Sequence, residues 1–194
     1  MPLGRDYAGQ NCSLARALEV VGERWTMLIL RDLFFGVRRF GAIKAHLDIP
    51  SAALSDRLAT LVDWGLVERT PYAGTRAEYL LTPRGLELWP ILYQLMQWGE
   101  RHFVDGDDVV RIFSHASCGT ELSASGTCAT CATTPGPDEI ETRPGAAAPR
   151  VIREDAISVA LRSPHRLLEP LPRPEGRRGA PSGAPRLERV SRRG

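Results

Sequence analysis

The chain contains 194 residues, of which 43% are hydrophobic and 25% are charged, and its formal net charge is +2. This length can bury one good core and leaves room for a second, smaller module. Residues 1–142 carry 13 basic and 18 acidic side chains, a balance of −5, whereas residues 143–194 carry 12 and 5, a balance of +7. These numbers exclude a protein that binds nucleic acid through a strongly basic overall field. Such binding would need a local arginine cluster or the basic tail.

We expect neither a signal peptide nor a membrane span in this sequence. Residues 1–13 lack the apolar centre of a signal peptide. The longest apolar run, residues 25–35, is interrupted by Arg31 and Asp32 and is too short to cross a bilayer. These features favour a soluble, cytoplasmic protein, in whose reducing compartment the four cysteines are thiols or metal ligands rather than structural disulfides.

Three helices are predicted after a loose N-terminal arm at residues 1–11. The first spans residues 12–21, and its apolar side chains form one stripe. The second, residues 25–35, is apolar on most sides, which is typical of a helix in the middle of a core. The third, residues 39–47, is short and is followed by a turn at residues 48–50. A short helix and a tight turn of this kind begin a helix-turn-helix.

The fourth helix, predicted over residues 51–64, completes the helix-turn-helix. Leu54, Leu58 and Leu61 recur at helical spacing and should face the core. The outward and flanking residues of its N-terminal half are small or polar, so this half could enter a DNA major groove, where the helix dipole also favours nearby phosphate. The residues assigned to DNA contact here are Ser51, Ala52, Ser55, Asp56 and Arg57. Asp56 fits only if it accepts from a cytosine amino group or an arginine, and an ordinary surface helix is the alternative.

A β-hairpin is predicted over residues 66–81, with its turn at Gly74. It follows the fourth helix directly, which is the order of a winged-helix DNA-binding domain. Arginine side chains at a hairpin tip can contact phosphates or lie along a minor groove. A solubilising loop tip is the alternative interpretation. The residues assigned to DNA contact are Arg69, Tyr72, Thr75 and Arg76, together with Arg39 at the start of the third helix.

A long helix is predicted over residues 83–103, with Thr82 as its N-cap and a proline in its first turn. Pro90 lies inside the pattern and should kink or break the helix. The helix has more apolar residues than one stripe against a small domain can bury, so we expect it to pack against a second copy of the chain. A two-fold dimer would present two recognition helices to a palindrome, about one DNA turn apart.

Four potential metal ligands lie in a predicted small β module at residues 105–145, namely His115, Cys118, Cys128 and Cys131. Two pairs of such residues, separated by a short β-like segment, are typical of a zinc ribbon. Four protein ligands make a closed, structural site, and zinc would supply much of the folding free energy of so small a module. The alternatives are a redox pair formed by Cys128 and Cys131, or a cluster that remains from a lost site.

The C-terminal part, residues 146–194, is rich in arginine, proline and glycine, and we expect it to be largely disordered. Within it, residues 154–168 could form one helix, although Pro164 limits the length. A basic tail would add non-specific, salt-sensitive affinity for DNA. An extension without a selected function, reflecting arginine-rich codon usage, is the alternative.

An ordered set of residues between positions 12 and 103 carries a family resemblance. The set comprises Cys12, Val21, Gly22, Trp25, Ile29, Leu30, Arg31, Leu33, Gly36, Arg39, Phe40, Leu54, Leu58, Leu61, Gly65, Leu66, Val67, Arg69, Glu78, Tyr79, Leu81, Thr82 and Gly85. It resembles the HxlR-type transcriptional regulators, which are winged-helix relatives of MarR. The resemblance implies a homodimer, formed through the first helix and the helix at residues 83–103, that binds operator DNA near promoters.

The resemblance also makes Cys12 a candidate redox sensor, because the early cysteine of some family members senses oxidants or electrophiles. A small packing residue in the dimer-facing helix is the alternative. Three positions depart from the family pattern. Pro50 precedes Ser51 at the start of the recognition helix, the wing lacks the usual prolines before Glu78, and a serine follows Cys12 in place of proline.

Together these features predict a mainly α fold with a small β-hairpin (α+β). The predicted parts are an arm at residues 1–11, a winged helix-turn-helix domain at 12–104, the β module at 105–145 and the tail at 146–194. The predicted function is that of a homodimeric DNA-binding transcriptional regulator. A winged-helix protein-interaction or redox-sensing module without sequence-specific DNA binding is the alternative. An enzyme is least favoured, because the sequence has no Ser/His/Asp set, paired carboxylates, phosphate-binding glycine loop or dinucleotide fingerprint.

Overall fold

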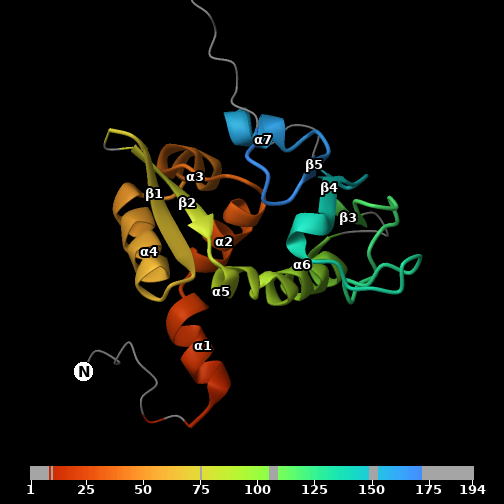
Figure 1. Ribbon diagram of the computed structural model, residues 1–194, viewed down its shortest axis with the longest axis horizontal. Helices are drawn as coiled ribbons and strands as arrows, with labels where there is room; N and C mark the ends of the chain where they lie inside the picture. Colours follow the sequence, from red (N-terminus) through yellow and green to blue (C-terminus); the bar gives the residue numbers. More distant parts are fainter. Residues whose placement is uncertain (1–8, 10, 75, 105–108, 149–152, 172–194) are drawn as a thin grey trace, which may run out of the picture.

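The computed structural model describes residues 9, 11–74, 76–104, 109–148 and 153–171. Figure 1 shows α4 and the β1–β2 hairpin at one end of the molecule, the sheet of β3, β4 and β5 at the other end, and α6 running between them. This arrangement confirms the predicted α+β class. The elements are α1 (Ser13–Val21), α2 (Thr26–Phe34), α3 (Phe40–Leu47), α4 (Ser51–Asp63), β1 (Val67–Ala73), β2 (Arg76–Leu81), α5 (Pro83–Leu86), α6 (Trp89–Phe103), β3 (Arg111–His115), the 3₁₀ helix Pro137–Glu139, β4 (Ile140–Pro144), α7 (Ala156–Ala160) and β5 (His165–Arg166).

Helix α2 lies at the centre of the core, as its all-round apolar character predicts. Ile29, Leu33 and Phe34 are almost completely buried, and the ring centroid of Phe34 lies 5.1 Å from that of Trp89 at the start of α6. Because α3, β2 and α6 all contact α2, this helix positions the helix-turn-helix, the hairpin and the long helix. Within the described residues, no helix combines the length and apolar character needed to cross a membrane.

The helix-turn-helix is formed by α3, α4 and the short connection between them. Asp48 adopts a left-handed backbone conformation with φ of +52°, which ends α3 and turns the chain. Pro50 occupies the N-cap position of α4, and it offers no side-chain oxygen to the first N–H groups of that helix. The inward residues Leu54, Leu58 and Leu61 are buried as predicted.

The hairpin of β1 and β2 packs tightly against the following helix. Its antiparallel register runs from Val67 opposite Leu81 to Ala73 opposite Arg76, with a bulge near the tip. A Cβ atom at Gly85 would lie 2.1 Å from the carbonyl oxygen of Leu66, so only glycine lets α5 approach the base of the hairpin this closely. The predicted wing is therefore present and firmly anchored at its base.

The single helix predicted over residues 83–103 is two helices, α5 and α6. The hydroxyl oxygen of Thr82 accepts a hydrogen bond from the backbone N–H of Gly85 at 3.1 Å, which confirms Thr82 as the N-cap of α5. Pro90 lies in the first turn of α6. Proline cannot donate a helical hydrogen bond, so the chain ends α5 and starts a new helix at the point where proline is tolerated.

The C-terminal half packs directly on the winged helix and shares its hydrophobic core. The ring of Phe113 in β3 lies 5.7 Å from that of Trp89 and 5.4 Å from that of Tyr93. The phenolic hydroxyl of Tyr93 donates a hydrogen bond to the carbonyl of Ser123 at 2.8 Å. The core therefore continues across the boundary that the sequence analysis set after residue 104.

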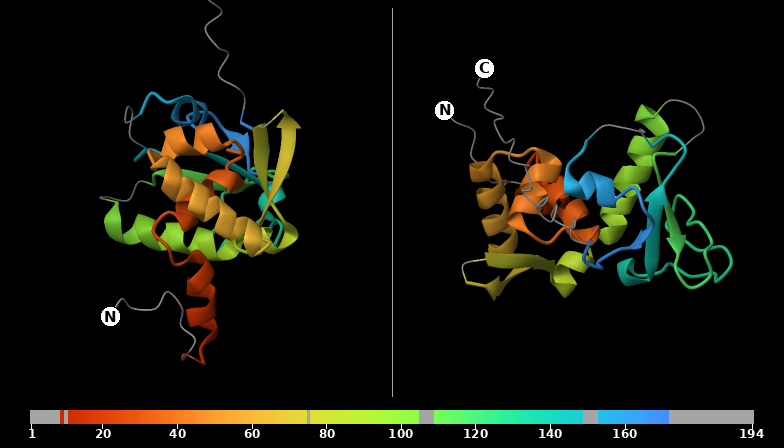
Figure 2. Two further views of the ribbon diagram at one scale, coloured as in Figure 1. Left: turned by 90° about the vertical axis from the view of Figure 1, so that its left-hand side faces the viewer. Right: turned by 90° about the horizontal axis from the view of Figure 1, so that it is seen from above.

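Part of the tail that was expected to be disordered is folded, because it contains apolar residues with a place in the core. Ile157, Leu161 and Leu167 are buried, and a side-chain oxygen of Asp155 caps α7 by accepting from the N–H groups of Ile157 and Ser158 at 3.1 and 3.0 Å. The predicted single helix at 154–168 is instead α7 followed by the short strand β5. Figure 2 shows this segment lying over the helix-turn-helix and the second sheet. Residues 172–194 lie outside the described residues.

The end of this segment is fastened to the end of α2. The N–H of Leu168 donates to the carbonyl of Phe34 at 2.7 Å. Gly36 has φ of +81°, and a Cβ atom there would lie 1.8 Å from the carbonyl oxygen of Glu169. The close approach of the two chain segments therefore requires glycine at position 36.

Candidate nucleic-acid interface and metal centre

The outward face of α4 is open to solvent. Ser51, Ala52, Ser55 and Asp56 are all exposed. The absence of a side-chain cap from Pro50 leaves the first N–H groups of the helix available to an outside acceptor such as a phosphate oxygen. The N-terminal half of α4 thus has the small polar surface that a groove-binding helix needs.

The two charged residues of this face have different surroundings. Arg57 is half-buried, and its Nη1 lies 3.6 Å from Oε2 of Glu23, so part of its charge is neutralised within the domain. Asp56 forms no ion pair with any described residue. Among the described residues, therefore, no arginine serves as the partner of Asp56.

The arginines assigned to the wing line one groove between the start of α3 and the hairpin. The volume of this groove is about 480 Å³. Arg69 and Arg76 are exposed and form no ion pair with a described residue, so both can neutralise phosphate. Thr75 lies outside the described residues. The groove is lined by Arg39, Phe40, Gly41, Ala42, Arg69, Tyr72, Arg76, Ala77 and Tyr79.

Arg39 is the one arginine lining this groove that forms an ion pair with a described residue. Its Nε and Nη2 donate to Oε1 of Glu78 at 3.0 and 2.8 Å, and its guanidinium carbon lies 4.6 Å from the ring centroid of Tyr72. The ion pair and the cation–π contact hold the side chain against the hairpin. Arg39 and Tyr72 thus brace the wing as well as line the groove.

The open half of α4 and the wing tip lie at the same end of the molecule. α4 ends at Asp63 and the chain reverses at Gly65, so β1 runs back past the helix at the same end of the molecule (Figure 1). This end of the molecule therefore carries the polar face of α4 and two arginines that form no ion pair with a described residue.

The four predicted metal ligands converge at the far end of the molecule. One donor atom from each of His115, Cys118, Cys128 and Cys131 lies within 4.8 Å of all the others. The Sγ atoms of Cys118 and Cys128 are 3.5 Å apart, and Sγ of Cys118 is 3.6 Å from Nδ1 of His115. Thiolates bound to one tetrahedral zinc with bonds of about 2.3 Å lie about 3.8 Å apart, so the cluster has the size of a zinc site.

Two tight turns present the ligands. The N–H groups of Cys118 and Gly119 both point back to the carbonyl of His115, at 3.2 and 2.8 Å, and Gly119 has the positive φ that the sequence analysis expected. In the second turn, the N–H of Cys128 donates to the carbonyl of Thr133 at 2.8 Å. Each turn aims two ligands at a common point, which is the knuckle arrangement of a zinc ribbon.

The electrostatics of the cluster favour a thiolate at one position. Hydrogen bonds from the side chain and backbone of Thr120 lower the pKa of Cys118 to about 6. The pKa of Cys131 is raised to about 11, mainly by its hydrogen bond to Cys118. Nε2 of His115 lies 3.1 Å from the hydroxyl of Ser117, a contact that fixes the ring while Nδ1 faces Cys118. The residues present therefore fit a metal that takes sulfur and nitrogen ligands.

Cys12 lies apart from this cluster, as the exposed N-cap residue of α1. Arg16, the nearest cation considered for activating its thiol, instead donates to Oε1 of Glu19 at 3.0 Å. Cys12 thus remains a candidate sensor only through its position at a helix N-terminus.

A buried ionic network in the middle of the domain was missed by the sequence analysis. Asp32 is completely buried in α2, where Oδ1 accepts from Nη2 of Arg31 at 2.7 Å and Oδ2 lies 2.8 Å from Nδ1 of His46 in α3. The signal that could have found it is an aspartate within an otherwise apolar helix, because such a carboxylate requires a partner.

The three-helix core, the helix-turn-helix and the exposed hairpin define a winged helix-turn-helix protein of the DNA-binding class. A family model described as HxlR-like helix-turn-helix matches residues 20–107, and the chain belongs to this family of transcriptional regulators. Its relatives are regulators, which confirms the expectation that the protein is not an enzyme.

Two curated relatives and one solved structure illustrate the similarity. The chain is 45% identical over 121 residues to the uncharacterized HTH-type transcriptional regulator Rv3095 of Mycobacterium tuberculosis, covering 61% of this chain and 77% of that protein. It is 37% identical over 86 residues to the uncharacterized HTH-type transcriptional regulator YvaP of Bacillus subtilis, covering 43% and 80%. The reduced form of the redox regulator HypR is 29% identical, covering 46% of this chain and 92% of that chain with a TM-score of 0.44.

Proposed function

We propose that the protein binds a palindromic operator as a homodimer, with the recognition helix at residues 51–64 in the major groove. The wing at residues 66–81 would lie on the phosphate backbone or in the minor groove. The observation that carries this proposal is the exposed polar face of α4 at the same end of the molecule as the arginine-lined groove. A regulator of this kind acts where the chromosome lies, so we place it in the cytoplasm.

The proposed dimer forms through α1 and α6. Leu14 in α1 is 65% exposed, and α6 exposes Ile91 at 57%, Leu95 at 50% and Phe103 at 75%. Large apolar side chains gathered on neighbouring surfaces mark an interaction site more often than a free surface. Figure 2 shows α1 projecting from the body of the molecule, which lets it reach a second subunit. An interface of this kind pairs the same surface on both copies.

A winged-helix interaction module that does not select a DNA sequence is the second candidate function. The observation that favours it is that two arginines of the proposed DNA surface face carboxylates of the same chain. Arg39 is paired with Glu78, and Arg57 lies near Glu23. Asp56 adds a negative charge to the exposed face of α4. A surface with these features carries fewer free cations than most DNA-binding surfaces.

We further propose that His115, Cys118, Cys128 and Cys131 hold one structural zinc ion. Three thiols and one imidazole form a soft ligand set that suits zinc better than the hard cations Mg²⁺ or Ca²⁺. Zinc would join the two turns of a module that has few core residues of its own. With all four positions taken by the protein, the site would be closed and structural rather than catalytic.

The DNA proposal is tested by fluorescence anisotropy of the full-length protein on DNA from its own upstream intergenic region, at about 50 and about 200 mM salt. We expect sequence-selective binding that weakens with salt. Arg76→Ala should weaken binding to all sequences and reduce the salt slope by about 1, whereas Ser55→Ala should alter sequence preference.

Arg84→Ala is the matched control, because Arg84 donates to the carbonyl of Trp64 at the opposite end of α4. It should bind like the parent. If Arg76→Ala and Ser55→Ala also bind like the parent, the proposed docking is wrong. If the upstream intergenic DNA and unrelated DNA bind with equal affinity, an interaction module without sequence selectivity becomes the better description of the protein.

A further inference from the structure

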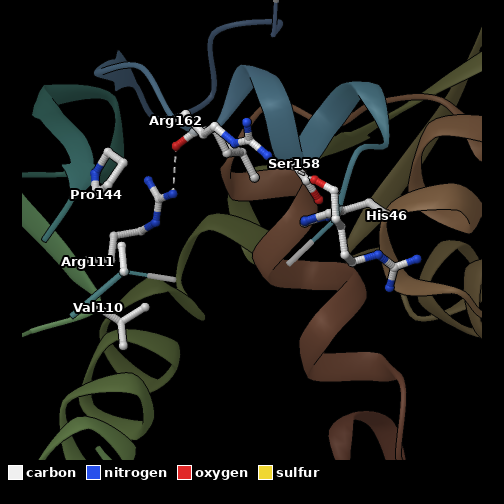
Figure 3. Close-up of a pocket in the computed structure, with 9 residues that line it drawn as sticks. His46, Val110, Arg111, Pro144, Ser158 and Arg162 are labelled. Carbon is white, nitrogen blue, oxygen red and sulfur yellow. Dashed lines mark hydrogen bonds between the residues drawn. The ribbon is translucent and has the colours of Figure 1, made fainter. Parts of the chain in front are cut away.

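A cavity of about 210 Å³ lies where the C-terminal half of the chain meets the helix-turn-helix. Figure 3 shows Arg111 and His46 on opposite sides of it, with Ser158 and Arg162 along its upper edge. These residues come from β3, from α3 and from the α7 segment, so the cavity joins three parts of the fold. Its lining is completed by Val110, Pro144, Ala148, Arg153 and Leu161.

The cavity carries a surplus of positive charge. Among the described residues, three arginines and one histidine line it, and no carboxylate does. Two of these groups face carboxylates outside the lining: Nε of Arg153 lies 3.4 Å from Asp155, and Nδ1 of His46 lies 2.8 Å from Asp32. The other two cations, Arg111 and Arg162, form no ion pair with any described residue.

Arg111 is the more deeply placed of the two. Its Nη2 donates to the carbonyl of Leu161 at 2.9 Å and its Nη1 to the hydroxyl of Thr142 at 3.3 Å. Its guanidinium carbon lies 5.3 Å from the ring centroid of Phe35. These partners satisfy some of its N–H groups, yet no described residue supplies a counterion for its half-buried charge. Burial, helped by the nearby charge of Arg31, lowers the pKa of Arg111 to about 10.

We propose that this cavity is a binding site for a small oxyanion, the carboxylate or phosphate group of a metabolite-sized ligand. Arg111 would be its principal partner, because a guanidinium pairs with carboxylate or phosphate through two parallel hydrogen bonds. Arg162 lies at the exposed edge and would complete the positive rim. The hydroxyl of Ser158 already donates to Asp155, so it is not needed as a ligand donor.

The size of the cavity limits the ligand. Sites for drug-sized molecules usually measure about 300–1,000 Å³, and this one is smaller. A compact acid or a small phosphate therefore fits better than a nucleotide. The walls contributed by Val110, Pro144 and Leu161 are apolar, which suits a short carbon skeleton next to the charged group.

The site also touches the helix-turn-helix. His46 belongs to α3, and Nη2 of Arg153 donates to the carbonyl of Ala45 in the same helix at 2.9 Å. A ligand held by Arg111 and Arg162 would thus join β3 and the α7 segment next to α3. Any consequence for operator binding rests on the proposed function, whereas the existence of the anion site does not.

The test is the thermal unfolding midpoint of the full-length protein in increasing sodium phosphate or sodium succinate, at an ionic strength held constant with sodium chloride. At a tenfold excess over Kd, a single site should raise the midpoint by roughly 3–6 °C. The rise should saturate with concentration. A saturable rise in the midpoint with either anion supports the site. A rise with phosphate alone indicates phosphate-bearing ligands, and a rise with succinate alone indicates carboxylate ligands.

Arg111→Met removes the guanidinium and keeps the apolar stem, so it should lower the affinity for the anion at least about tenfold. Arg143→Met is the matched control, because Arg143 lies on the adjacent strand β4, outside the cavity, and pairs with Glu121 at 2.7 Å. It should keep the full effect. Arg162→Ala changes an exposed edge residue and supplies the same test if Arg111→Met folds poorly.

Two results overturn the proposal. One is the absence of a saturable rise with both anions in the parent protein. The other is a rise that Arg111→Met and Arg162→Ala leave unchanged. Because the measurement contains no DNA, it is independent of the outcome of the operator-binding experiment.

Discussion

At the residue scale, Asp32 is the side chain whose partners matter most to the domain. It is completely buried in α2 and contacts both Arg31 and His46. A buried carboxylate is tolerated only when it is paired and hydrogen-bonded. The Asp32–His46 contact joins α2 to α3, so this pair helps to set the position of the helix-turn-helix on its supporting helix.

Asp32→Ala should lower the free energy of unfolding by about 2–3 kcal/mol, measured by urea denaturation. This magnitude is below that of a wholly buried pair, because the side chain of Arg31 is 27% exposed and solvent screens part of its charge. Asp56→Ala is the control on an exposed helix face and should leave the stability nearly unchanged. Equal effects of the two substitutions would contradict the structural role of Asp32.

His165 predicts a pH dependence of stability. Burial lowers its pKa below the ordinary value of about 6.5, and its Nε2 is buried without a hydrogen-bond partner among the described residues. Below pH 6.5 the unfolded chain therefore binds this proton more readily than the folded chain does. Stability should be full above about pH 6.5 and fall as the pH drops toward the lowered pKa.

The measurement is a urea-denaturation series on the parent and His165→Gln between pH 7.5 and pH 5.0. We expect the variant to lose less stability over this interval, since glutamine does not titrate. Parallel pH profiles for the two proteins would show that another group dominates.

At the element scale, the two ligand-bearing turns differ from the rest of the fold in how they are held. Their polar contacts to α6 are few, such as the hydrogen bond from Nε2 of Gln94 to the carbonyl of Ala124 at 2.9 Å. Cys128 is completely buried, whereas Cys118 and Cys131 are exposed. Turns of this kind depend on a shared ligand rather than on a core of their own.

Cys131→Ser should reduce the zinc content from one ion per chain, measured by native mass spectrometry with elemental analysis. Cys12→Ser is the matched control, because Cys12 is also exposed and lies outside the cluster. It should retain the metal. A chelator should increase amide exchange in residues 115–134 of the parent, because the free energy of binding is part of the folding free energy of the turns. A parent protein that lacks zinc and still protects these residues would count against the site.

At the scale of the whole molecule, the two halves of the chain act as one folded unit. Phe113 packs among Trp89 and Tyr93, and Leu168 is bonded to the end of α2. Among the described residues, six of the eleven exposed large apolar side chains lie on α1 and α6. That distribution supports the proposed interface between copies.

Leu95→Arg should convert the dimer to a monomer, as measured by size-exclusion chromatography with light scattering, because an arginine at the centre of the interface would be desolvated without a partner. Val159→Arg is the matched control: Val159 in α7 is 47% exposed and Leu95 is 50% exposed, but Val159 lies away from α1 and α6. This variant should remain dimeric. If the parent protein is monomeric at all concentrations, the proposed dimer interface is wrong.

The sequence by itself determined the features that depend on local spacing. Helical spacing of Leu54, Leu58 and Leu61 identified the buried face of α4, and Thr82 identified the start of α5. The ligand spacing predicted a cluster that the structure brings within 4.8 Å. The buried helix face, the cap and each pair of ligands follow from residues a few positions apart, whose relation is set by local backbone geometry. The meeting of the two ligand pairs depends on the fold.

Only the tertiary structure decided the relations between distant residues. Asp32 contacts His46 of another helix, and the N–H of Leu168 donates to the carbonyl of Phe34. The surroundings of Arg111 also come from several segments. No sequence period connects these segments. The folded state of residues 153–171 belongs to the same group. Their composition is that of a disordered tail. Burial of their few apolar residues offsets the conformational entropy lost on folding only because the winged helix supplies a surface on which to bury them.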